Sequence, residues 1–464
     1  MTPSARTVAV VGGGLAGLSA ACALAEAGFR VTLLERRPYL GGRASSYQHP
    51  GTGEVVDNCQ HVVLACCTNL LDFYRRTGVE QKIRWYDRLT FLEPGGRQTV
   101  LAPSWLPAPL HAVPSFLAAS SLGFADKLAI SRAMLRFLSS VPADFGEPFL
   151  GWLRRHGQTE RAINRFWKVV LVSALNEDLD RMSVHYAAQV FRESFLKSAA
   201  AGRMGVPTVP LTELYAAGIA YLEARGGQVR LRSTAESFEP QADGVLLRAS
   251  AGDLRADFAV LAVPFDAAAR LLPVQPEAEP LRAQLGRFAT SPITGIHLWF
   301  DREVTELDHA VLLDRTIQWM FHKSRILERR AGEGNGSYLE LVVSSSKSLV
   351  EKPRNEILEL ALAEFKEFFP KAAEARLMKS TVIKEVHATY SALPGSDEYR
   401  PGTATVWPRV FLAGDWTATG WPATMEGAVR SGYRAAEEVA RAAGQTESFL
   451  VPDFEPSGLM RLFD

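Results

Sequence analysis

Three glycines near the start of the chain have the spacing of a turn that binds a dinucleotide. Gly12, Gly14 and Gly17 form a GxGxxG pattern between an apolar stretch, residues 7–11, and an alanine-rich stretch, residues 18–27. In a strand–turn–helix unit, the first glycine permits the tight turn, the second lets a pyrophosphate approach the backbone, and the third lets helix and strand pack closely. The N-terminus of the helix then stabilises the phosphate charge. The predicted cofactor contacts of this turn are Gly12, Gly14, Leu15, Ala16 and Gly17.

A carboxylate follows this turn at the distance expected for a ribose ligand. Glu35 lies eighteen residues beyond Gly17, directly after the next apolar stretch, residues 31–34. A carboxylate at this position accepts hydrogen bonds from the hydroxyls of an unphosphorylated ribose. The turn and Glu35 together predict a site for FAD or NAD rather than for NADP.

The elements that must position these residues occur in three separated parts of the chain. Residues 7–34 have the pattern of one strand–helix–strand unit, and buried strands with helices recur after residue 205 and near the C-terminus. Residues 69–204 have mainly helical periodicity, and residues 266–401 have strand patterns around one amphipathic helix. We predict an α/β plus α+β architecture, in which a Rossmann-like dinucleotide-binding domain is interleaved with a substrate domain. The predicted bounds are 1–68, 205–265 and 402–445 for the discontinuous dinucleotide-binding domain, 69–204 for the helical part of the substrate domain, 266–401 for its β-rich part, and 446–464 for a C-terminal tail.

The composition indicates a large globular protein without affinity for nucleic acid. Of the 464 residues, 47% are hydrophobic and 22% are charged, and 51 Lys and Arg residues balance 51 Asp and Glu residues. This balance leaves no long-range field to attract a polyanion. The four cysteines have no CxxC or metal-type spacing, so we predict a reduced compartment, no disulfide framework and no metal site. We also expect no secretory leader, because the first residues are polar.

A second glycine-containing motif resembles that of the FAD-dependent amine oxidase and carotenoid desaturase superfamily. After Glu35 the sequence continues with Arg36 and, at residues 41–43, with Gly-Gly-Arg. The resemblance implies that the cofactor is FAD, that Gly42 lets the backbone reach it, and that Arg43 lies near the flavin and the pyrophosphate. It also implies an FAD-binding domain of the glutathione-reductase and amine-oxidase type.

Residues 411–416 and 425–432 resemble the closing motif of the same superfamily. The two runs read FLAGDW and MEGAVRSG. The resemblance implies an acid that accepts hydrogen bonds from the ribityl chain, followed by a helix whose N-terminal partial positive charge faces the flavin pyrimidine. Small residues on this helix would let other backbone approach closely. The further cofactor-binding residues that the resemblance implies are Gly414, Asp415, Met425 and Ala235, the last of them beside the adenine.

The longest similarity is to the bacterial squalene-associated, FAD-dependent hydroxysqualene dehydroxylases. It is carried by residues 56–61, by residues 292–301 and by the tail from Gly414, and it extends over nearly the whole chain. Plant-type phytoene desaturases resemble the same stretches more weakly and usually have Gly where this chain has Cys59. The resemblance implies reductive removal of the allylic hydroxyl of hydroxysqualene to give squalene, a step of squalene and hopanoid biosynthesis.

Removal of this hydroxyl requires an acid that protonates the leaving group and a hydride from the reduced flavin. The resemblance places Asp57 and His61 beside the flavin, and we predict that one of them is the acid. His61 suits this role because an imidazole titrates near neutral pH. Glu426 is a third candidate.

Two other interpretations stay open. An FAD-dependent desaturase of the phytoene type, or an amine oxidase, would use the flavin in the opposite direction, and Lys384 is available as the lysine that amine oxidases place near the flavin. A non-catalytic prenyl-lipid carrier, similar to the Rab GDP-dissociation inhibitors, would share the fold without using flavin. The intact glycine motif, Glu35 and Asp415 argue against such a carrier.

An apolar isoprenoid substrate implies contact with a membrane surface. The longest apolar stretch, residues 101–122, contains four prolines, which disfavour a helix that spans the bilayer. Trp105 and its apolar neighbours suit an ordinary buried lid or, as the alternative, a segment that dips into the bilayer surface. We predict a cytoplasmic protein with peripheral contact at the cytoplasmic face of a bacterial inner membrane, and hydroxysqualene and squalene as its small-molecule partners.

Overall fold

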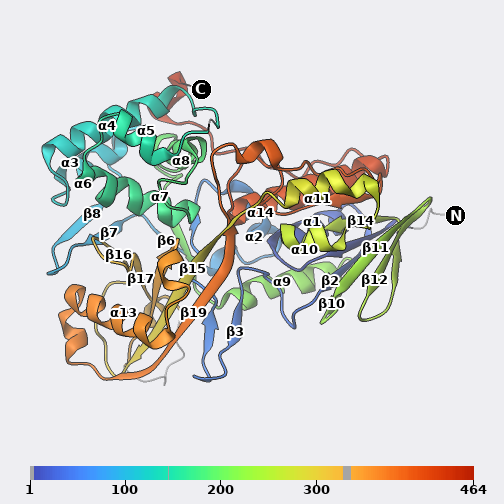
Figure 1. Cartoon of the computed structure of the whole chain (residues 1–464), viewed down its shortest axis with the longest axis horizontal. Coiled ribbons are helices and arrows are strands. Elements are labelled where there is room, and N and C mark those ends of the chain that lie inside the picture. Colours follow the sequence, from blue (N-terminus) through green and yellow to red (C-terminus); the bar gives the residue numbers. More distant parts are fainter. Residues whose placement is uncertain (1–4, 145, 328–335, 464) are drawn as a thin grey trace.

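A parallel sheet forms the centre of the first domain in the computed structural model, which describes residues 5–144, 146–327 and 336–463 (Figure 1). Its strand order is β10-β2-β1-β14-β20, and all neighbouring strands are parallel. These strands come from distant parts of the chain because crossover segments must return each strand to the same edge. Their bounds are Thr7–Val11 for β1, Arg30–Glu35 for β2, Gln228–Leu231 for β10, Phe258–Leu261 for β14 and Val410–Leu412 for β20.

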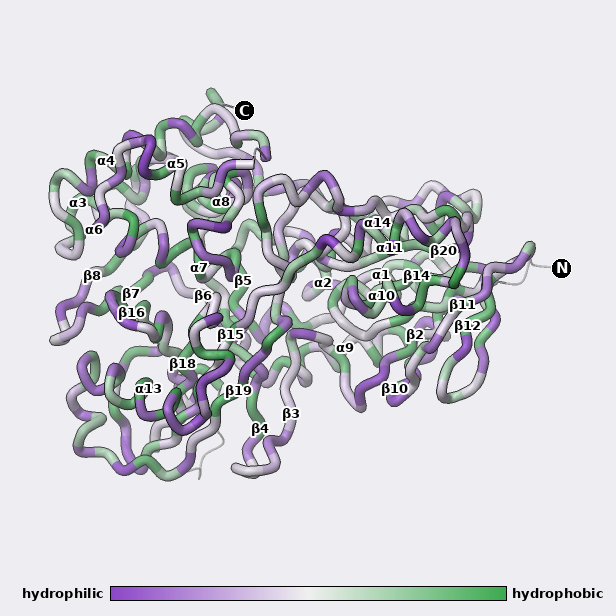
Figure 2. Tube along the Cα trace, in the orientation of Figure 1, coloured by the Kyte–Doolittle hydropathy of each residue, from purple (hydrophilic) through white to green (hydrophobic). Residues whose placement is uncertain are grey.

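Two helices pack tightly against each other over this sheet. They are α1 (Leu15–Glu26) and α14 (Met425–Ala442), and α9 (Leu211–Glu223) also contacts α1. A Cβ atom on Gly432 of α14 would lie 2.1 Å from Ser19 Oγ, so only glycine permits this approach. The green segments around α1 and β14 in Figure 2 belong to this shared core, to which α14 adds apolar residues of one face. The small-residue face predicted for the closing helix is therefore where α14 contacts α1.

A small antiparallel sheet and two helices complete this half of the molecule. The sheet consists of β11 (Ala235–Gln241), β12 (Gly244–Ala249) and β13 (Leu254–Ala256). The helices α10 (Phe265–Leu271) and α11 (Glu279–Leu285) follow β14 along the chain.

The second large sheet has seven strands in the order β19-β15-β18-β17-β16-β7-β8. One face carries alternate apolar residues of β15 and β18 and is covered by α13 (Arg354–Phe368). Because side chains alternate along a strand, Gly295, His297 and Glu340 belong to the opposite face. The strands are Leu89–Leu92 (β7), Gln98–Leu101 (β8), Thr290–Phe300 (β15), His309–Leu312 (β16), Trp319–His322 (β17), Tyr338–Ser344 (β18) and Leu377–Tyr390 (β19).

The prediction of a mainly helical segment over residues 69–204 is wrong for part of that range. Residues 83–101 form β6 (Ile83–Tyr86), β7 and β8, and the last two extend the seven-stranded sheet. The physical reason is a hairpin turn at Gly95 and Gly96, whose φ angles of +89° and +86° favour glycine. The helices that do occur are Thr68–Arg76 (α2), Val113–Ala118 (α3), Phe124–Ser139 (α4), Phe149–Arg155 (α5), Glu160–Ala162 (α6), Lys168–Leu175 (α7) and Val184–Phe191 (α8).

Short strands connect the two large sheets. β3 (Ser46–Gln48) pairs with β4 (Val55–Asp57), while β9 (Met204–Pro207) pairs with both β5 (Val63–Leu64) and β6. Residues 57–61, the last residue of β4 and the loop that follows it, contact both halves: Asn58 donates to Arg43 O, and a Cβ atom on Gly295 of β15 would lie 3.5 Å from Asn58 O. Among the described residues, no helix combines the length and the apolarity needed to cross a bilayer.

Candidate functional site

The GxGxxG turn leaves no room for side chains at two of its glycines. A Cβ atom on Gly12 would lie 2.4 Å from Ala262 O, and one on Gly17 would lie 1.9 Å from Gly12 O. Gly14 precedes α1 as its N-cap and supplies no side chain to the N–H groups of the first turn. Those N–H groups, which include the ones of Leu15 and Ala16, are therefore placed to bind an anion at the helix N-terminus.

The Gly-Gly-Arg loop packs directly on this turn, backbone against backbone. The N–H of Gly41 donates to Gly13 O at 2.9 Å. A Cβ atom on Gly42 would lie 2.9 Å from Gly14 Cα, and the guanidinium of Arg37 donates to Gly42 O at 2.9 Å. Gly42 and the turn thus form one surface that a pyrophosphate can approach. Arg36 is exposed on the protein surface. Its contact with the cofactor therefore stays a prediction.

Glu35 is buried at the end of β2 and is oriented by two backbone N–H groups. Its Oε2 accepts from the N–H of Gly13 and its Oε1 from the N–H of Arg37, both at 2.7 Å. Each carboxylate oxygen can accept a further hydrogen bond, so the group remains able to bind a ribose diol. The N–H of Ser233 donates to Glu35 O at 2.9 Å, which brings the segment before Ala235 next to the ribose ligand.

The closing motif reaches the same region from the other end of the chain. Asp415 is buried directly after β20 and accepts an ion-pair hydrogen bond from Arg43. The N–H of Gly414 donates to Ser431 Oγ at 2.8 Å, which ties this turn to α14. The hydroxyl of Tyr215 lies 3.6 Å from the sulfur of Met425, the first residue of α14.

These contacts bring together residues from four distant segments of the sequence: the glycine turn, the Gly-Gly-Arg loop, the end of β20 and the start of α14. They provide glycine backbone for a pyrophosphate, a carboxylate for a ribose, and, for the flavin end, a helix N-terminus and the buried Asp415 paired with the half-buried Arg43. This donor and acceptor set fits FAD.

A buried charged cluster lies beside this region at the start of the β4–β5 loop. Asp57 Oδ2 accepts a hydrogen bond from the Lys323 ammonium at 2.6 Å, and its Oδ1 accepts from the hydroxyl of Ser46 at 2.5 Å. Lys323 belongs to the short helix α12 (Lys323–Ile326) and also donates to Gln60 Oε1 at 2.8 Å. The third neighbour of the ammonium is Glu340 Oε2 at 3.6 Å.

The environment determines which members of this cluster carry charge. Burial opposes ionisation of Asp57, but the Lys323 ammonium and three hydrogen bonds lower its pKa below the ordinary value. Burial likewise opposes the charge on Lys323, but Asp57 and Glu340 raise its pKa. For Glu340 burial prevails over Lys323 and raises the pKa to about 8. These shifts favour an ion pair between Lys323 and Asp57, and they favour the protonated form of Glu340 below its pKa of about 8.

His61 lies at the other end of the same loop and is half-buried. Its Nδ1 is 2.8 Å from Cys59 O, and burial lowers its pKa below the ordinary value. The ring is therefore neutral near pH 7, with Nδ1–H donating to the carbonyl and Nε2 carrying a lone pair. Asp57 and His61, the two predicted catalytic residues, thus flank one loop, the first as a carboxylate and the second as a neutral imidazole.

Glu426 does not have the free carboxyl group that its predicted role as a proton donor requires. Its Oε1 accepts from Asn69 and from Arg430, and its Oε2 accepts from the N–H of Leu70 at 2.8 Å. It caps the N-terminus of α2 from α14 and so joins these two helices. Lys384 likewise donates to the main-chain carbonyl of Val350 at 2.7 Å, on the α13 side of the sheet.

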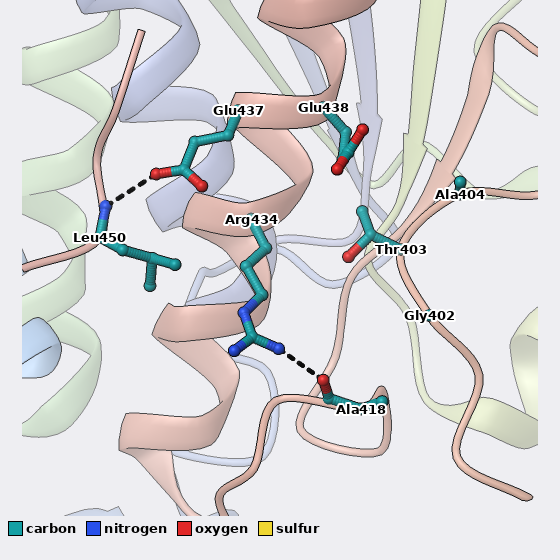
Figure 3. A pocket seen from close by; sticks show the side chains of 8 residues that line it. All are labelled: Gly402, Thr403, Ala404, Ala418, Arg434, Glu437, Glu438 and Leu450. Carbon is teal, nitrogen blue, oxygen red and sulfur yellow. Dashed lines mark hydrogen bonds between the residues drawn. The ribbon is translucent and has the colours of Figure 1, made fainter.

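A surface cavity of about 450 Å³ lies between α14 and the segments around Thr403, Ala418 and Leu450 (Figure 3). None of the predicted FAD-binding residues lines it. At this cavity, the guanidinium of Arg434 donates a hydrogen bond to Ala418 O, and Glu437 accepts one from the N–H of Leu450 at 3.0 Å. Its lining residues are Gly402, Thr403, Ala404, Ala418, Arg434, Glu437, Glu438 and Leu450. Within the described residues, no group of three His, Cys, Asp or Glu side chains is arranged to hold a metal ion.

Lys323 and Glu340 are not among the site residues predicted from the sequence. One signal was present in the sequence: Glu340 interrupts the otherwise apolar strand β18, YLELVVS, and such an acid is rarely buried without a partner. Its partner could not be read from the sequence, because Lys323 and Asp57 are 266 positions apart.

Comparisons with known proteins identify the family and the fold. Residues 15–440 match the model of the flavin-containing amine oxidoreductases. The 15-cis-phytoene desaturase of Synechococcus elongatus is 29% identical over 457 residues, which cover 93% of this chain and 95% of that protein. An oxidoreductase from Methanosarcina mazei superposes with a TM-score of 0.72 at 16% identity, covering 92% of this chain and 98% of that chain. A wild-type putrescine oxidase bound to putrescine superposes with a TM-score of 0.71 at 18% identity, covering 94% and 99%.

Proposed function

The chain belongs to the flavin-containing amine oxidoreductase family, and from this premise we propose that it is an FAD-dependent oxidoreductase of a long, apolar isoprenoid. The specific reaction that we propose is the removal of the allylic hydroxyl of hydroxysqualene to give squalene. The observation that supports the proposal is the buried cluster beside the FAD-binding loops, in which the carboxyl group of Glu340 lies 3.6 Å from the Lys323 ammonium that pairs with Asp57. Burial raises the pKa of Glu340 to about 8. Loss of a hydroxyl group needs such a proton source, because hydroxide is a poor leaving group.

FAD, when bound, supplies or accepts the hydride. The residues that hold it are those of the glycine turn, Gly42, Arg43, Asp415 and the start of α14. The ionised Asp57 does not donate a proton at neutral pH, so its proposed role is to stabilise positive charge near the reaction. We propose that His61 is the residue nearest the substrate, because it is half-buried and only its Nδ1 is used in the hydrogen bond to Cys59 O. Its Nε2, on the other side of the ring, is left for the substrate.

Desaturation is the second candidate reaction, and the names of the relatives favour it directly. The curated relatives include 15-cis-phytoene desaturases and a probable zeta-carotene desaturase, which is 27% identical to this chain. A neutral His61 also suits desaturation, since this reaction needs a base that accepts a proton from the substrate. For dehydroxylation the same residue would first have to be protonated.

One experiment distinguishes the two reactions. The purified protein is reduced with dithionite under argon, excess reductant is removed, and hydroxysqualene is added while the flavin absorbance is followed and lipids are extracted. We expect the oxidised flavin spectrum to return as squalene forms. If it does not return, but phytoene bleaches the oxidised protein anaerobically, desaturation is the correct reaction.

We further propose that the protein reaches its substrate at an anionic membrane surface. On α4, Phe124, Leu128 and Leu135 lie on one helix face and are exposed, and Phe124 has 83% of its surface exposed. Hydrophobic and hydrophilic segments alternate along this helix in Figure 2. Lys127, Arg132 and Arg136 are its cations, and its single acid, Asp126, is buried. An apolar stripe flanked by cations matches the interface of an anionic bilayer.

Two neighbouring segments add to this apolar surface. Trp105 has 90% of its surface exposed in the segment before α3, and Leu117 is exposed at the end of α3, where its carbonyl accepts from Lys127 at 2.6 Å. The C-terminal turn is attached here through the N–H of Leu459, which donates to Ala108 O at 2.8 Å, and it exposes Leu462. The C-terminus lies beside α4 and α5 in Figure 1.

A further inference from the structure

The loop of residues 57–61 is held from two sides. On one side, the Lys323 ammonium binds the carboxylate of Asp57 at 2.6 Å and the amide oxygen of Gln60 at 2.8 Å. On the other side, Asn58 donates to Arg43 O at 2.9 Å, and the N–H of Ser45 donates to Asn58 Oδ1 at 3.1 Å. The loop that carries Asp57 and His61 is therefore clamped between α12 and the FAD-binding loop.

We propose that Lys323 is the residue that positions this loop and that Glu340 is a buried proton-binding site that decides whether Lys323 stays on the loop. Lys323 is almost completely buried, and the two hydrogen bonds of its ammonium that are shorter than 3 Å go to the loop residues Asp57 and Gln60. Glu340 Oε2 lies farther away, at 3.6 Å, and the backbone N–H of Gln60 also faces this carboxyl group. Within the described residues, neither oxygen of Glu340 has a hydrogen-bond partner closer than 3.5 Å. Glu340 is thus a competing anion for Lys323 as soon as it loses its proton.

The other groups that face Glu340 do not titrate in the same range. His297, its partner in the β15–β18 register, has its Nδ1 2.9 Å from the hydroxyl of Tyr338, and burial lowers its pKa to about 3. Burial raises the pKa of the Cys59 thiol well above its ordinary value. Asp57 is ionised and Lys323 is charged at neutral pH. Glu340 is the member of the cluster whose charge changes around pH 8.

Loss of the proton from Glu340 changes the balance of forces on Lys323. With Glu340 protonated, one ammonium faces one carboxylate and the cluster is neutral. After the proton leaves to solvent, two buried carboxylates share one ammonium, and the second one attracts Lys323 away from Asp57 and Gln60. The loop then loses the clamp on its α12 side. The spectrum of bound FAD can report this change without any substrate. The proposal is therefore independent of which isoprenoid the protein uses.

The test uses the FAD-loaded protein without substrate. Visible absorption and circular dichroism of the flavin are recorded from pH 6 to pH 10 in the wild type, in Glu340→Gln and in Glu364→Gln. Glu364 is a matched control, because it is a buried carboxylate on the opposite face of the same sheet, where it accepts from the N–H groups of Thr316 and Ile317. Infrared spectra over the same range report the carbonyl band of a protonated carboxyl group.

We expect a one-proton change of the flavin spectrum with a midpoint near pH 8 in the wild type and in Glu364→Gln. Glu340→Gln should keep the low-pH spectrum throughout and should lack one protonated-carboxyl band. A transition in Glu340→Gln equal to that of the wild type would overturn the proposal. So would a wild-type infrared titration of Glu340 without any change of the flavin spectrum, or the absence of a protonated-carboxyl band at pH 6.

Discussion

The ammonium of Lys323, the first residue of α12, lies 2.6 Å from the carboxylate of Asp57 at the end of β4, although the two residues are 266 positions apart. Both side chains are almost completely buried. A buried ion pair stabilises a fold only weakly compared with an apolar pair, but removal of one partner leaves an uncompensated charge in the interior. The pair therefore connects the FAD-binding loops to the seven-stranded sheet. Each charge is tolerated in the interior only while the other one is present.

Replacing Lys323 with Met should destabilise the protein strongly. The buried carboxylate of Asp57 would lose its counter-ion, and we expect the free energy of unfolding to fall by about 3 to 5 kcal/mol. Denaturant unfolding followed by circular dichroism measures this change. The double variant Lys323→Met with Asp57→Asn is the control and should recover a large part of the loss. Additive losses in the double variant would show that the two charges do not depend on each other.

The stability of the protein should decrease from weakly acidic to alkaline pH because of Glu340. Its pKa rises from the ordinary value of 4.5 to about 8 in the folded state, so the folded protein binds the proton more tightly than the unfolded chain. This contribution to stability is complete below the unfolded pKa and is lost as pH rises through the folded pKa, with a limiting slope of about 1.4 kcal/mol per pH unit. Unfolding free energies at pH 5, 7 and 9 measure it. Glu340→Gln should flatten this dependence; an unchanged slope would contradict the assignment.

Gly14→Glu should give a folded but colourless protein. A Cβ atom at this position would lie 3.7 Å from Gly42 Cα, which is an ordinary contact, so the backbone can accept a side chain. The carboxylate, however, would stand where the two glycine loops meet the pyrophosphate and would repel it. The ratio of flavin to protein absorbance measures the loss. Gly14→Ala is the matched control and should retain most of the FAD. Full FAD occupancy in Gly14→Glu would disprove the cofactor position.

The exposed face of α4 should be required for membrane binding but not for folding. In the triple variant Phe124→Ser, Leu128→Ser and Leu135→Ser, we expect flotation with phosphatidylglycerol-rich vesicles to fall at least about fivefold, since each buried apolar side chain contributes roughly 1.5 to 3 kcal/mol. Melting temperatures should stay close to the wild type. Val274→Ser is the control, because Val274 is 98% exposed at a distant site. Equal flotation of the triple variant and the wild type would rule out this face.

The cofactor and the parallel domain could be predicted from the sequence because their signals are local. Gly12, Gly14, Gly17 and Glu35 require particular residue types at a fixed spacing, since a turn, a helix N-terminus and a strand end must follow one another along the chain. The structure confirms this fold class, and the family confirms FAD. The strands β7 and β8 were missed because the helical periodicity of the segments around them concealed the turn at Gly95 and Gly96.

The charge state of the candidate site was decided only by the tertiary structure. The family resemblance placed Asp57 and His61 beside the flavin and made them the candidate acids. In the structure, the Lys323 ammonium and hydrogen bonds lower the pKa of Asp57, and burial lowers the pKa of His61, so these shifts favour a carboxylate and a neutral ring. The carboxyl group that keeps its proton is Glu340, on a strand far away in the sequence. A pKa depends on solvent access and on charges within a few ångströms, and both arise when distant segments pack together. Local sequence patterns can therefore indicate where FAD binds, whereas the packing of two sheets determines where the proton is held.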